Sequence, residues 1–283
     1  MSDPGSETPP PQSPHPARAS LHGRAAVAED RRGARRVAPT PGRRRGSFFR
    51  SLLSFVGELL ITAGLFLLLF IVWQLWWTSF ELEGDVKAQI ATFQQEHPPL
   101  DEFTPTHRTD APPQIGDVPM GEIYALLHVP RWNYRVMPIA QGTMPAVLNY
   151  GWAGHYPDTQ QAGEVGNFAI AAHRRTYGNN FRRIDTLEDA DPIVVETDDA
   201  YLVYEVYGRE IVDPTATRVV LPVPNEPGAV PTKRIMTMTT CHPEFGNTER
   251  FVVWSEMKYW VAKSEGIPEI LRDEPEGGGS DGT

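Results

Sequence analysis

The stretch MTMTTCHPEFGNTERF, residues 236–251, decides the fold of this chain and contains its only cysteine, Cys241. Apolar and polar side chains alternate up to the cysteine, which is the pattern of a β-strand with two different faces. The Pro-, Gly- and Asn-containing segment that follows predicts a turn, and RFVVW begins a second strand. If residues 234–241 and 250–257 pair through this turn, Arg250 returns beside Cys241.

Alternation assigns the side chains of the first strand to two faces. The cysteine shares its face with Ile235, Thr237 and Thr239. The opposite face carries Met236, Met238 and Thr240. The cysteine and the two methionines are therefore expected on opposite faces of the strand.

The rest of the C-terminal half also reads as β-structure. Short stretches rich in β-branched and aromatic residues, bounded by Gly, Pro or Asp, are EIYALLHVP (122–130), YRVMPIA (134–140), GNFAIAAH (166–173), PIVVET (192–197), AYLVYEVYGREIV (200–212) and RFVVWSEM (250–257). Short helices are predicted at TMPAVLNY (143–150) and NNFRRIDTL (179–187). Seven or eight strands of this kind predict a mainly β domain, either a closed barrel or a sandwich.

A continuous apolar run precedes the β-rich part of the chain. LLITAGLFLLLFIVWQLWW, residues 59–77, carries no charge and is long enough to cross the hydrocarbon core of a bilayer as a helix. Trp73, Trp76 and Trp77 gather at its C-terminal end, where indole rings favour the membrane interface. We predict one transmembrane helix over residues 53–78. A cleaved signal peptide is disfavoured, because the run is long and no clear cleavage site follows.

Charge predicts the direction of this span. Residues 1–50 carry ten Arg against four acidic residues, whereas the whole chain has a formal net charge of −10. The positive-inside rule then places the N-terminus in the cytoplasm and the domain outside, in a single-pass protein of the cell membrane. Residues 1–50 are predicted to be a disordered tail, and two roles stay open for its basic residues: setting the topology alone, or also contacting anionic membrane lipid. The sequence pI near 5.3 gives no support to nucleic-acid binding.

Differences in composition divide the region after the span into a linker, a compact domain and a C-terminal tail. Residues 79–117 are predicted to be a linker, with a short helix at ELEGDVKAQIATFQQEH followed by a Pro-rich, acidic segment. The compact domain is expected over residues 118–263, a common size for a single domain. The Gly- and acid-rich residues 264–283 are predicted to be a disordered tail.

A lone thiol outside the cytoplasm is buried and inert, paired between chains, or a working nucleophile. A nucleophilic thiolate usually has an imidazole partner. Away from the turn after the cysteine, the domain contains His128, His155 and His173. His173 is expected to share a strand face with Ala169 and Ala171, which leave room for an extended substrate. Metal-ligand spacings and phosphate-binding loops are absent from the sequence, so we expect no metal and no cofactor.

These motifs resemble those of the sortases, membrane-anchored cysteine transpeptidases of Gram-positive bacteria. TMTTC (237–241) is similar to the family's TLxTC box, with Met238 where Leu is usual. AIAAHR (169–174) is similar to its catalytic histidine box, with Ala172 where Gly is usual, and Arg250 matches the arginine that follows the cysteine. Further stretches resemble class E, the housekeeping type of high-GC actinobacteria: GHYP (154–157), HRRTYG (173–178) and TTCHPEFGNTER (239–250). The resemblance covers about half the chain, residues 118–262.

The resemblance implies an eight-stranded sortase-type β-barrel and a two-step reaction. Cys241 would cleave a C-terminal sorting signal of the LAxTG or LPxTG type between Thr and Gly, and would hold the cleaved protein as a thioester. His173 would move protons, and Arg250 would hold the substrate and its carbonyl oxygen as charge develops. The implied partners are secreted proteins that carry the signal and the amine of a lipid-linked peptidoglycan precursor. The product would be a protein anchored to the cell wall.

Four further residues are expected to contact the signal: His155 and Tyr156, in the segment GWAGHYPDTQQAGEVGN, and Thr239 and Thr240, beside the cysteine. Two alternatives stay open. A hydrolytic cysteine protease would pass through the same acyl-enzyme, and a membrane-tethered binding or scaffolding module would carry an inert cysteine. A peptidoglycan L,D-transpeptidase would carry its cysteine in an SHGC-like box, which is absent from this sequence.

Overall fold

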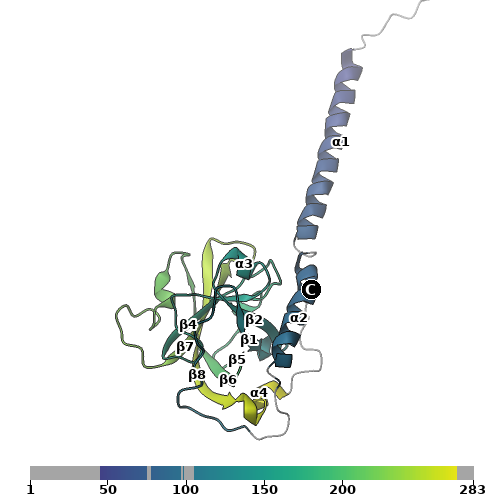
Figure 1. Ribbon diagram of the computed structural model, residues 1–283. Helices are drawn as coiled ribbons and strands as arrows, with labels where there is room; N and C mark the ends of the chain where they lie inside the picture. Colours follow the sequence, from purple (N-terminus) through teal and green to yellow (C-terminus); the bar gives the residue numbers. More distant parts are fainter. Residues whose placement is uncertain (1–44, 75–77, 97, 99–104, 273–283) are drawn as a thin grey trace, which may run out of the picture. The chain divides into compact units, whose positions relative to one another are not determined.

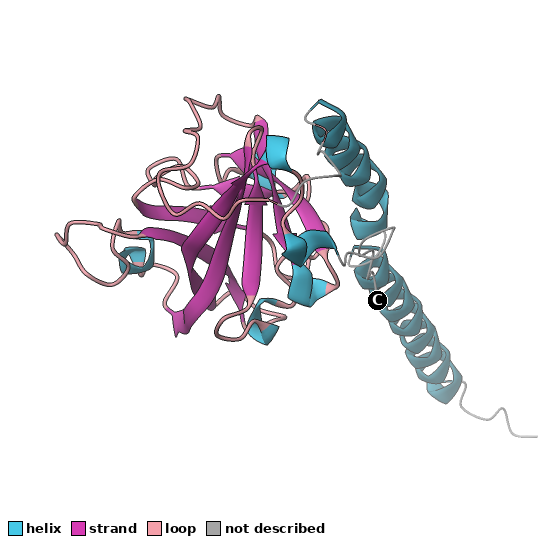
Figure 2. Cartoon of the chain, turned by 90° about the horizontal axis from the view of Figure 1, so that it is seen from below, coloured by secondary structure: helices cyan, strands magenta, loops and turns pink. Residues whose placement is uncertain are grey.

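The computed structural model describes residues 45–74, 78–96, 98 and 105–272. Among these residues, eight strands close into one barrel in the order β1-β2-β3-β4-β7-β8-β6-β5 (Figures 1 and 2). The strands are β1 (Ile123–Val129), β2 (Arg135–Gln141), β3 (Ala153–His155), β4 (Gly166–Ala171), β5 (Pro192–Glu196), β6 (Ala200–Val212), β7 (Arg234–His242) and β8 (Glu249–Ala262). The predicted eight-stranded, mainly β fold is confirmed.

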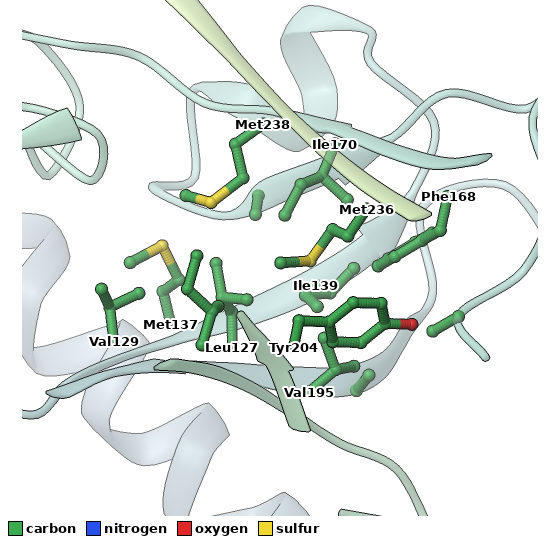
Figure 3. Packing of buried hydrophobic residues seen from close by; sticks show 14 of the residues in the cluster. Leu127, Val129, Met137, Ile139, Phe168, Ile170, Val195, Tyr204, Met236 and Met238 are labelled. Atoms are coloured by element: carbon green, nitrogen blue, oxygen red, sulfur yellow. The ribbon is translucent and has the colours of Figure 1, made fainter. Parts of the chain in front are cut away.

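Alternate side chains of each strand point into the barrel and form its apolar core. Figure 3 shows Leu127, Ile139, Phe168 and other apolar side chains from different strands packed together. Met236 and Met238 lie fully buried in this cluster, so the face of β7 that carries them is the inner one. Each such side chain contributes about 1.5–3 kcal/mol when it is removed from water.

One short strand was not predicted as a separate element. β3 lies within GWAGHYP, pairs parallel with β2 and antiparallel with β4, and completes the closure of the barrel. It is only three residues long, too short for alternation to stand out in the sequence.

The helices in the described part of the chain are short except for two near its N-terminal end. They are α1 (Arg45–Val72), α2 (Thr78–Glu96), α3 (Pro145–Leu148) and α4 (Glu269–Arg272), with the 3₁₀ turns η2 (Pro130–Trp132), η3 (Ile184–Thr186), η4 (Thr217–Val220) and η5 (Lys263–Glu265). α3 lies within the predicted helix 143–150. The predicted helix 179–187 contains only η3, and η5 and α4 occupy part of the stretch predicted to be a disordered tail.

Helix α1 overlaps the predicted membrane span, residues 53–78, but begins earlier, at Arg45, and ends at Val72. Its portion Phe48–Val72 is long and apolar enough to cross a membrane, and these side chains are not covered by other parts of the protein. Predictions for residues 1–44, Trp76, Trp77, 99–104 and 273–283 lie outside the described residues. Within the predicted linker, the backbone of Arg108 pairs with that of Trp260 through two hydrogen bonds of 3.0 and 2.9 Å.

Candidate active site

The cysteine and the arginine lie on neighbouring strands. β7 runs antiparallel to β8, and Cys241 lies directly opposite Arg250 in the ladder. Both side chains are half-buried, and the thiol is free. Met236 and Met238 of β7 point into the core, so alternation places Cys241 on the outer face of the barrel. The predicted approach of Arg250 to Cys241 therefore occurs.

The Arg250 guanidinium has local partners in this structure. Its Nη1 donates hydrogen bonds to the backbone oxygens of Asn247 at 2.9 Å and Glu249 at 2.8 Å. These bonds hold the guanidinium at the start of β8. Both acceptors are neutral carbonyl groups, and the Asp213 carboxylate is close enough for the Arg250 charge to add to the Thr215 hydrogen bonds that lower the pKa of Asp213.

Strand register brings the histidine to the same place. β4 runs parallel to β7, with Ala171 opposite Thr239, and the Ala172 amide donates to the Thr239 carbonyl at 3.3 Å. His173 follows Ala171 by two residues, and Cys241 follows Thr239 by two residues. Because the strands are parallel, both residues leave the sheet at the same end. The structure thus brings together the three predicted catalytic residues.

Two side chains surround the His173 imidazole. Its Nε2 forms a hydrogen bond of 2.9 Å with the Oδ1 of Asn149, just after α3. The Tyr177 ring lies against the imidazole with 5.1 Å between centroids and an interplanar angle of 36°. Desolvation by burial lowers the pKa of His173 below its ordinary value. Near neutral pH the ring is therefore mainly uncharged and able to accept a proton.

The sequence did not identify Arg174 as part of the site, but its side chain contacts the backbone of Cys241 and the ring of His242. It is 3% exposed, and its Nη1 donates to His242 Nδ1 at 3.0 Å and to the Cys241 carbonyl at 3.5 Å. Its Nη2 pairs with Asp185 at 3.0 Å, and its guanidinium lies 5.8 Å from the centre of the Phe251 ring. Arg174 therefore ties the segment that carries His173 to the end of the cysteine strand.

Two of the predicted signal-contacting residues are bonded to each other. The Tyr156 hydroxyl and Thr239 Oγ1 lie 2.9 Å apart, on the face of the sheet that carries Cys241. Thr240 points the other way: it is 3% exposed, and its hydroxyl donates to the Ala172 carbonyl at 2.7 Å. Thr240 thus fastens β7 to the residue before the histidine.

The fourth predicted contact, His155, is buried beneath the loop that follows β3. It is 1% exposed; Nδ1 lies 2.8 Å from Gln141 Oε1, and Nε2 lies 3.1 Å from Thr159 Oγ1 and 3.0 Å from the Gln160 carbonyl. Desolvation lowers the pKa of His155 to about 4. A neutral imidazole in this position braces the loop that carries Tyr156.

The segment between β6 and β7, which contains η4, packs on the same outer face of the barrel and is held there by hydrogen bonds to its backbone carbonyls. The Val219 carbonyl of η4 accepts hydrogen bonds from Asn167 Nδ2 at 3.3 Å and Trp254 Nε1 at 3.2 Å. Asn167 Nδ2 also donates to the Leu221 carbonyl at 2.9 Å, and Thr237 Oγ1 donates to Asn167 Oδ1 at 2.7 Å. The segment between β6 and β7 is thus fixed against β4, β7 and β8.

Comparison with known proteins is consistent with this geometry. The sortase domain family model matches residues 127–258. Sortase SrtE1 of Streptomyces coelicolor is 36% identical over 223 residues, covering 76% of this chain and 60% of that protein. SrtE2 of the same organism is 37% identical over 229 residues, covering 76% of this chain and 86% of that protein.

Solved structures agree in fold. The SrtA sortase from Actinomyces oris matches with a TM-score of 0.57 at 50% identity, over 60% of this chain and 98% of that one. A crystal structure of sortase E1 from Streptomyces coelicolor with a tripeptide in the active site matches with a TM-score of 0.50 at 41% identity, over 53% and 97% of the two chains. By its barrel and by its similarity to SrtE1 and SrtE2, this chain belongs to the sortase family, and its relatives include sortases of class E.

Proposed function

We propose that this chain is a membrane-anchored cysteine transpeptidase. It cleaves a C-terminal sorting signal of the LAxTG or LPxTG type between Thr and Gly, and transfers the protein to the amine of a lipid-linked peptidoglycan precursor. The observation that carries the proposal is the convergence of Cys241, His173 and Arg250 at one end of β4, β7 and β8. The tripeptide in the sortase E1 crystal structure supports a peptide substrate.

In the first step the Cys241 thiol passes its proton to the neutral His173, and the thiolate attacks the carbonyl carbon of the signal's threonine. A carbon–sulfur bond forms, and the carbonyl oxygen takes up negative charge beside Arg250. Collapse of this intermediate breaks the Thr–Gly bond. The imidazolium gives its proton to the departing glycine amine, which leaves a thioester on Cys241.

In the second step the acceptor amine attacks the thioester carbonyl and loses a proton to His173. The carbon–sulfur bond breaks, the new amide leaves, and the imidazolium returns its proton to the Cys241 thiolate. Water in place of the amine gives hydrolysis, as in a cysteine protease, so the acceptor decides between the two outcomes.

Arg250 has to exchange partners during this cycle. Its Nη1 donates hydrogen bonds to the carbonyls of Asn247 and Glu249. A substrate carbonyl that gains negative charge is a stronger acceptor than either, because hydrogen bonds to charged groups are roughly twice as strong as neutral ones. Arg250 would therefore favour the transition state over the free substrate.

Contacts to the sorting signal are assigned to the outer face near Cys241. Tyr156, which is half-buried, is the residue placed to meet the peptide, and Thr239, 4% exposed on the same face, holds its hydroxyl group. His155 and Thr240 are 1% and 3% exposed. We expect these two to act on the peptide through the loop and the strand that they hold.

The anchor is assigned to helix α1, with the N-terminus in the cytoplasm and the barrel outside. The lone thiol offers a direct test of this topology. A membrane-impermeant maleimide should label Cys241 in intact cells. Labelling that requires lysis, with the protein intact and membrane-bound, would reverse the orientation.

The reaction itself is tested by mass spectrometry of the full chain in detergent with an LAxTG peptide, an LPxTG peptide in parallel, and an amine acceptor added or withheld. A thioester adduct on Cys241 that passes to the amine is the expected result. Intact peptides and an unmodified thiol would favour a membrane-tethered binding module. Cys241→Ala, His173→Ala and Arg250→Ala should each abolish turnover in a folded protein, and a fully active His173→Ala variant would remove the proton-transfer assignment.

A further inference from the structure

Asn149 is the polar partner of the histidine, and its side chain has a defined position. It follows α3 directly, and its backbone amide bonds back to the Pro145 carbonyl at 3.0 Å. Its Oδ1 lies 2.9 Å from His173 Nε2. An amide oxygen only accepts hydrogen bonds, so this contact requires a hydrogen on Nε2.

The segments that carry the two residues are tied together beyond this bond. Asn180, 3% exposed, donates from Nδ2 to the Gly151 carbonyl. Arg135 Nη2 donates to the Gly178 carbonyl at 2.6 Å and to Asn180 Oδ1 at 2.8 Å. A Cβ at Gly151 would lie 3.2 Å from the Tyr177 carbonyl, which is a close backbone approach. The distance from Asn149 to the imidazole is therefore set by a braced pair of loops.

The ring has little freedom to turn. Tyr177 lies against the imidazole with its centroid 5.1 Å away, so a flip of the ring would have to overcome this contact as well as the Asn149 bond. Among the described residues no hydrogen bond reaches His173 Nδ1. With Nε2 engaged by Asn149, the nitrogen left for proton exchange is Nδ1.

We infer that Asn149 is a positioning residue that holds His173 in the Nε2–H tautomer and directs Nδ1 to the thiol of Cys241. The inference deepens the proposed function and rests on it for the role of His173. A cysteine, a histidine and an amide acceptor would then form one unit, an arrangement that nucleophilic enzymes of other folds also use to orient the base. Nothing in the sequence marks Asn149, which precedes His173 by 24 residues.

The same bond also affects the charged state of the ring. Burial disfavours the imidazolium, whereas an acceptor at Nε2 favours it, since hydrogen bonds to the charged form stabilise that form. Asn149 should therefore partly offset the effect of burial. Its removal should lower the pKa of His173 further and allow the Nδ1–H tautomer.

The test is nuclear magnetic resonance of the imidazole nitrogens in the full chain, labelled with ¹⁵N-histidine in detergent micelles, with His173 assigned from its loss in His173→Ala. Wild type should show a single Nε2–H tautomer. Asn149→Ala should show a mixture of tautomers and a kcat lower by about tenfold or more, the cost of one hydrogen bond to a group that becomes charged. The KM for the peptide should stay within about twofold, because Asn149 is assigned a contact with the imidazole and none with the peptide.

The Asn149→Asp variant distinguishes a role of residue 149 in orienting the His173 ring from a role in stabilising the fold. A carboxylate also accepts from Nε2–H, so it should restore the single tautomer and raise the pKa of His173, and the acid limb of kcat/KM should move to higher pH than in Asn149→Ala. Ala146→Gly is the matched control, because it loosens the same helix at an exposed position without touching the imidazole.

Two results would overturn the inference: an Nδ1–H tautomer in wild type, or an Asn149→Ala variant with an unchanged tautomer and kcat. The resonance readout does not require turnover. A tautomer that depends on Asn149 in a chain that processes no peptide would leave the positioning intact and refute the proposed function.

Discussion

Replacement of Arg174 by methionine should weaken the end of β7 that carries Cys241. Methionine keeps much of the apolar stem but removes the guanidinium, which is buried at 3% exposure. Its hydrogen bond to His242 and its contact with the Cys241 carbonyl are lost together. The strand end would then be held by its ladder with β8 and by the bonds that join Thr239 and Thr240 to Ala172.

The expected loss in the free energy of unfolding is the sum of the interactions that Arg174 makes with His242, Cys241 and Asp185. A hydrogen bond that involves a charged group contributes about 1.5–3 kcal/mol, and this applies to the 3.0 Å bond to His242. The contact with the Cys241 carbonyl, at 3.5 Å, lies at the limit of hydrogen-bond geometry and adds little. The Asp185 carboxylate is 49% exposed, so solvent screens that ion pair to about 0–1 kcal/mol. We expect a loss of about 2–3 kcal/mol in the free energy of unfolding.

Urea unfolding of the full chain in detergent measures this loss, and peptide turnover with the rate of Cys241 alkylation reports on the site. The turnover number of Arg174→Met should fall by about tenfold or more as the thiol loses its fixed position. Arg174→Lys keeps the charge without the planar fork and should recover only part of it. Asp185→Asn is the matched control and should cost less than about 1 kcal/mol.

One outcome would refute this reasoning. If Arg174→Met unfolds within about 1 kcal/mol of wild type and retains its turnover number and alkylation rate, the buried guanidinium does not support the site. An effect of equal size in Asp185→Asn would instead assign the stability to the ion pair, which the exposure of that carboxylate argues against.

Three other perturbations test parts of the site. Tyr156→Phe removes the hydroxyl bonded to Thr239 and should cost about 1 kcal/mol in urea unfolding. Thr239→Val also loses the 3.4 Å contact with the Ile170 carbonyl, so the double variant should lose less than the sum of the two single losses; full additivity would contradict the contact between Tyr156 and Thr239. Asn167→Ala should release the Val219 segment and speed limited proteolysis between residues 213 and 233, whereas an unchanged cleavage rate would argue against this clamp. His155, with a pKa lowered to about 4 from its ordinary value of about 6.5, makes the folded state lose stability as pH falls through this window, because the unfolded chain takes up the proton first. The loss should approach about 3 kcal/mol near pH 4, and His155→Gln should flatten that part of the stability profile.

Local patterns were sufficient for several features. Alternation over residues 234–241 predicted which side chains of β7 share a face, because the two-residue period of a strand is a local property. The hairpin turn predicted the pairing of Cys241 with Arg250, since a short connection leaves few alternatives to an antiparallel ladder. The long uncharged run predicted helix α1 by length alone.

Other features depended on partners far apart in the chain. β3 is too short for its pattern to be visible, and it forms because β2 and β4 supply its hydrogen bonds. The stretch 179–187 had a helical pattern but became mainly turns, and its Asn180 is used to brace the loops near the histidine. Tertiary contacts outweigh weak local propensity in such segments.

By itself, the sequence determined the long apolar helix, the strand that carries Cys241 and the choice of His173 and Arg250 as candidate partners. The tertiary structure decided that β4 lies parallel to β7, which brings His173 to the cysteine, and that Asn149 and Arg174 hold the two ends of the site. The physical reason is range. Periodicity and charge act between near neighbours in the chain, whereas a hydrogen bond between Asn149 and His173 exists only after the barrel has closed.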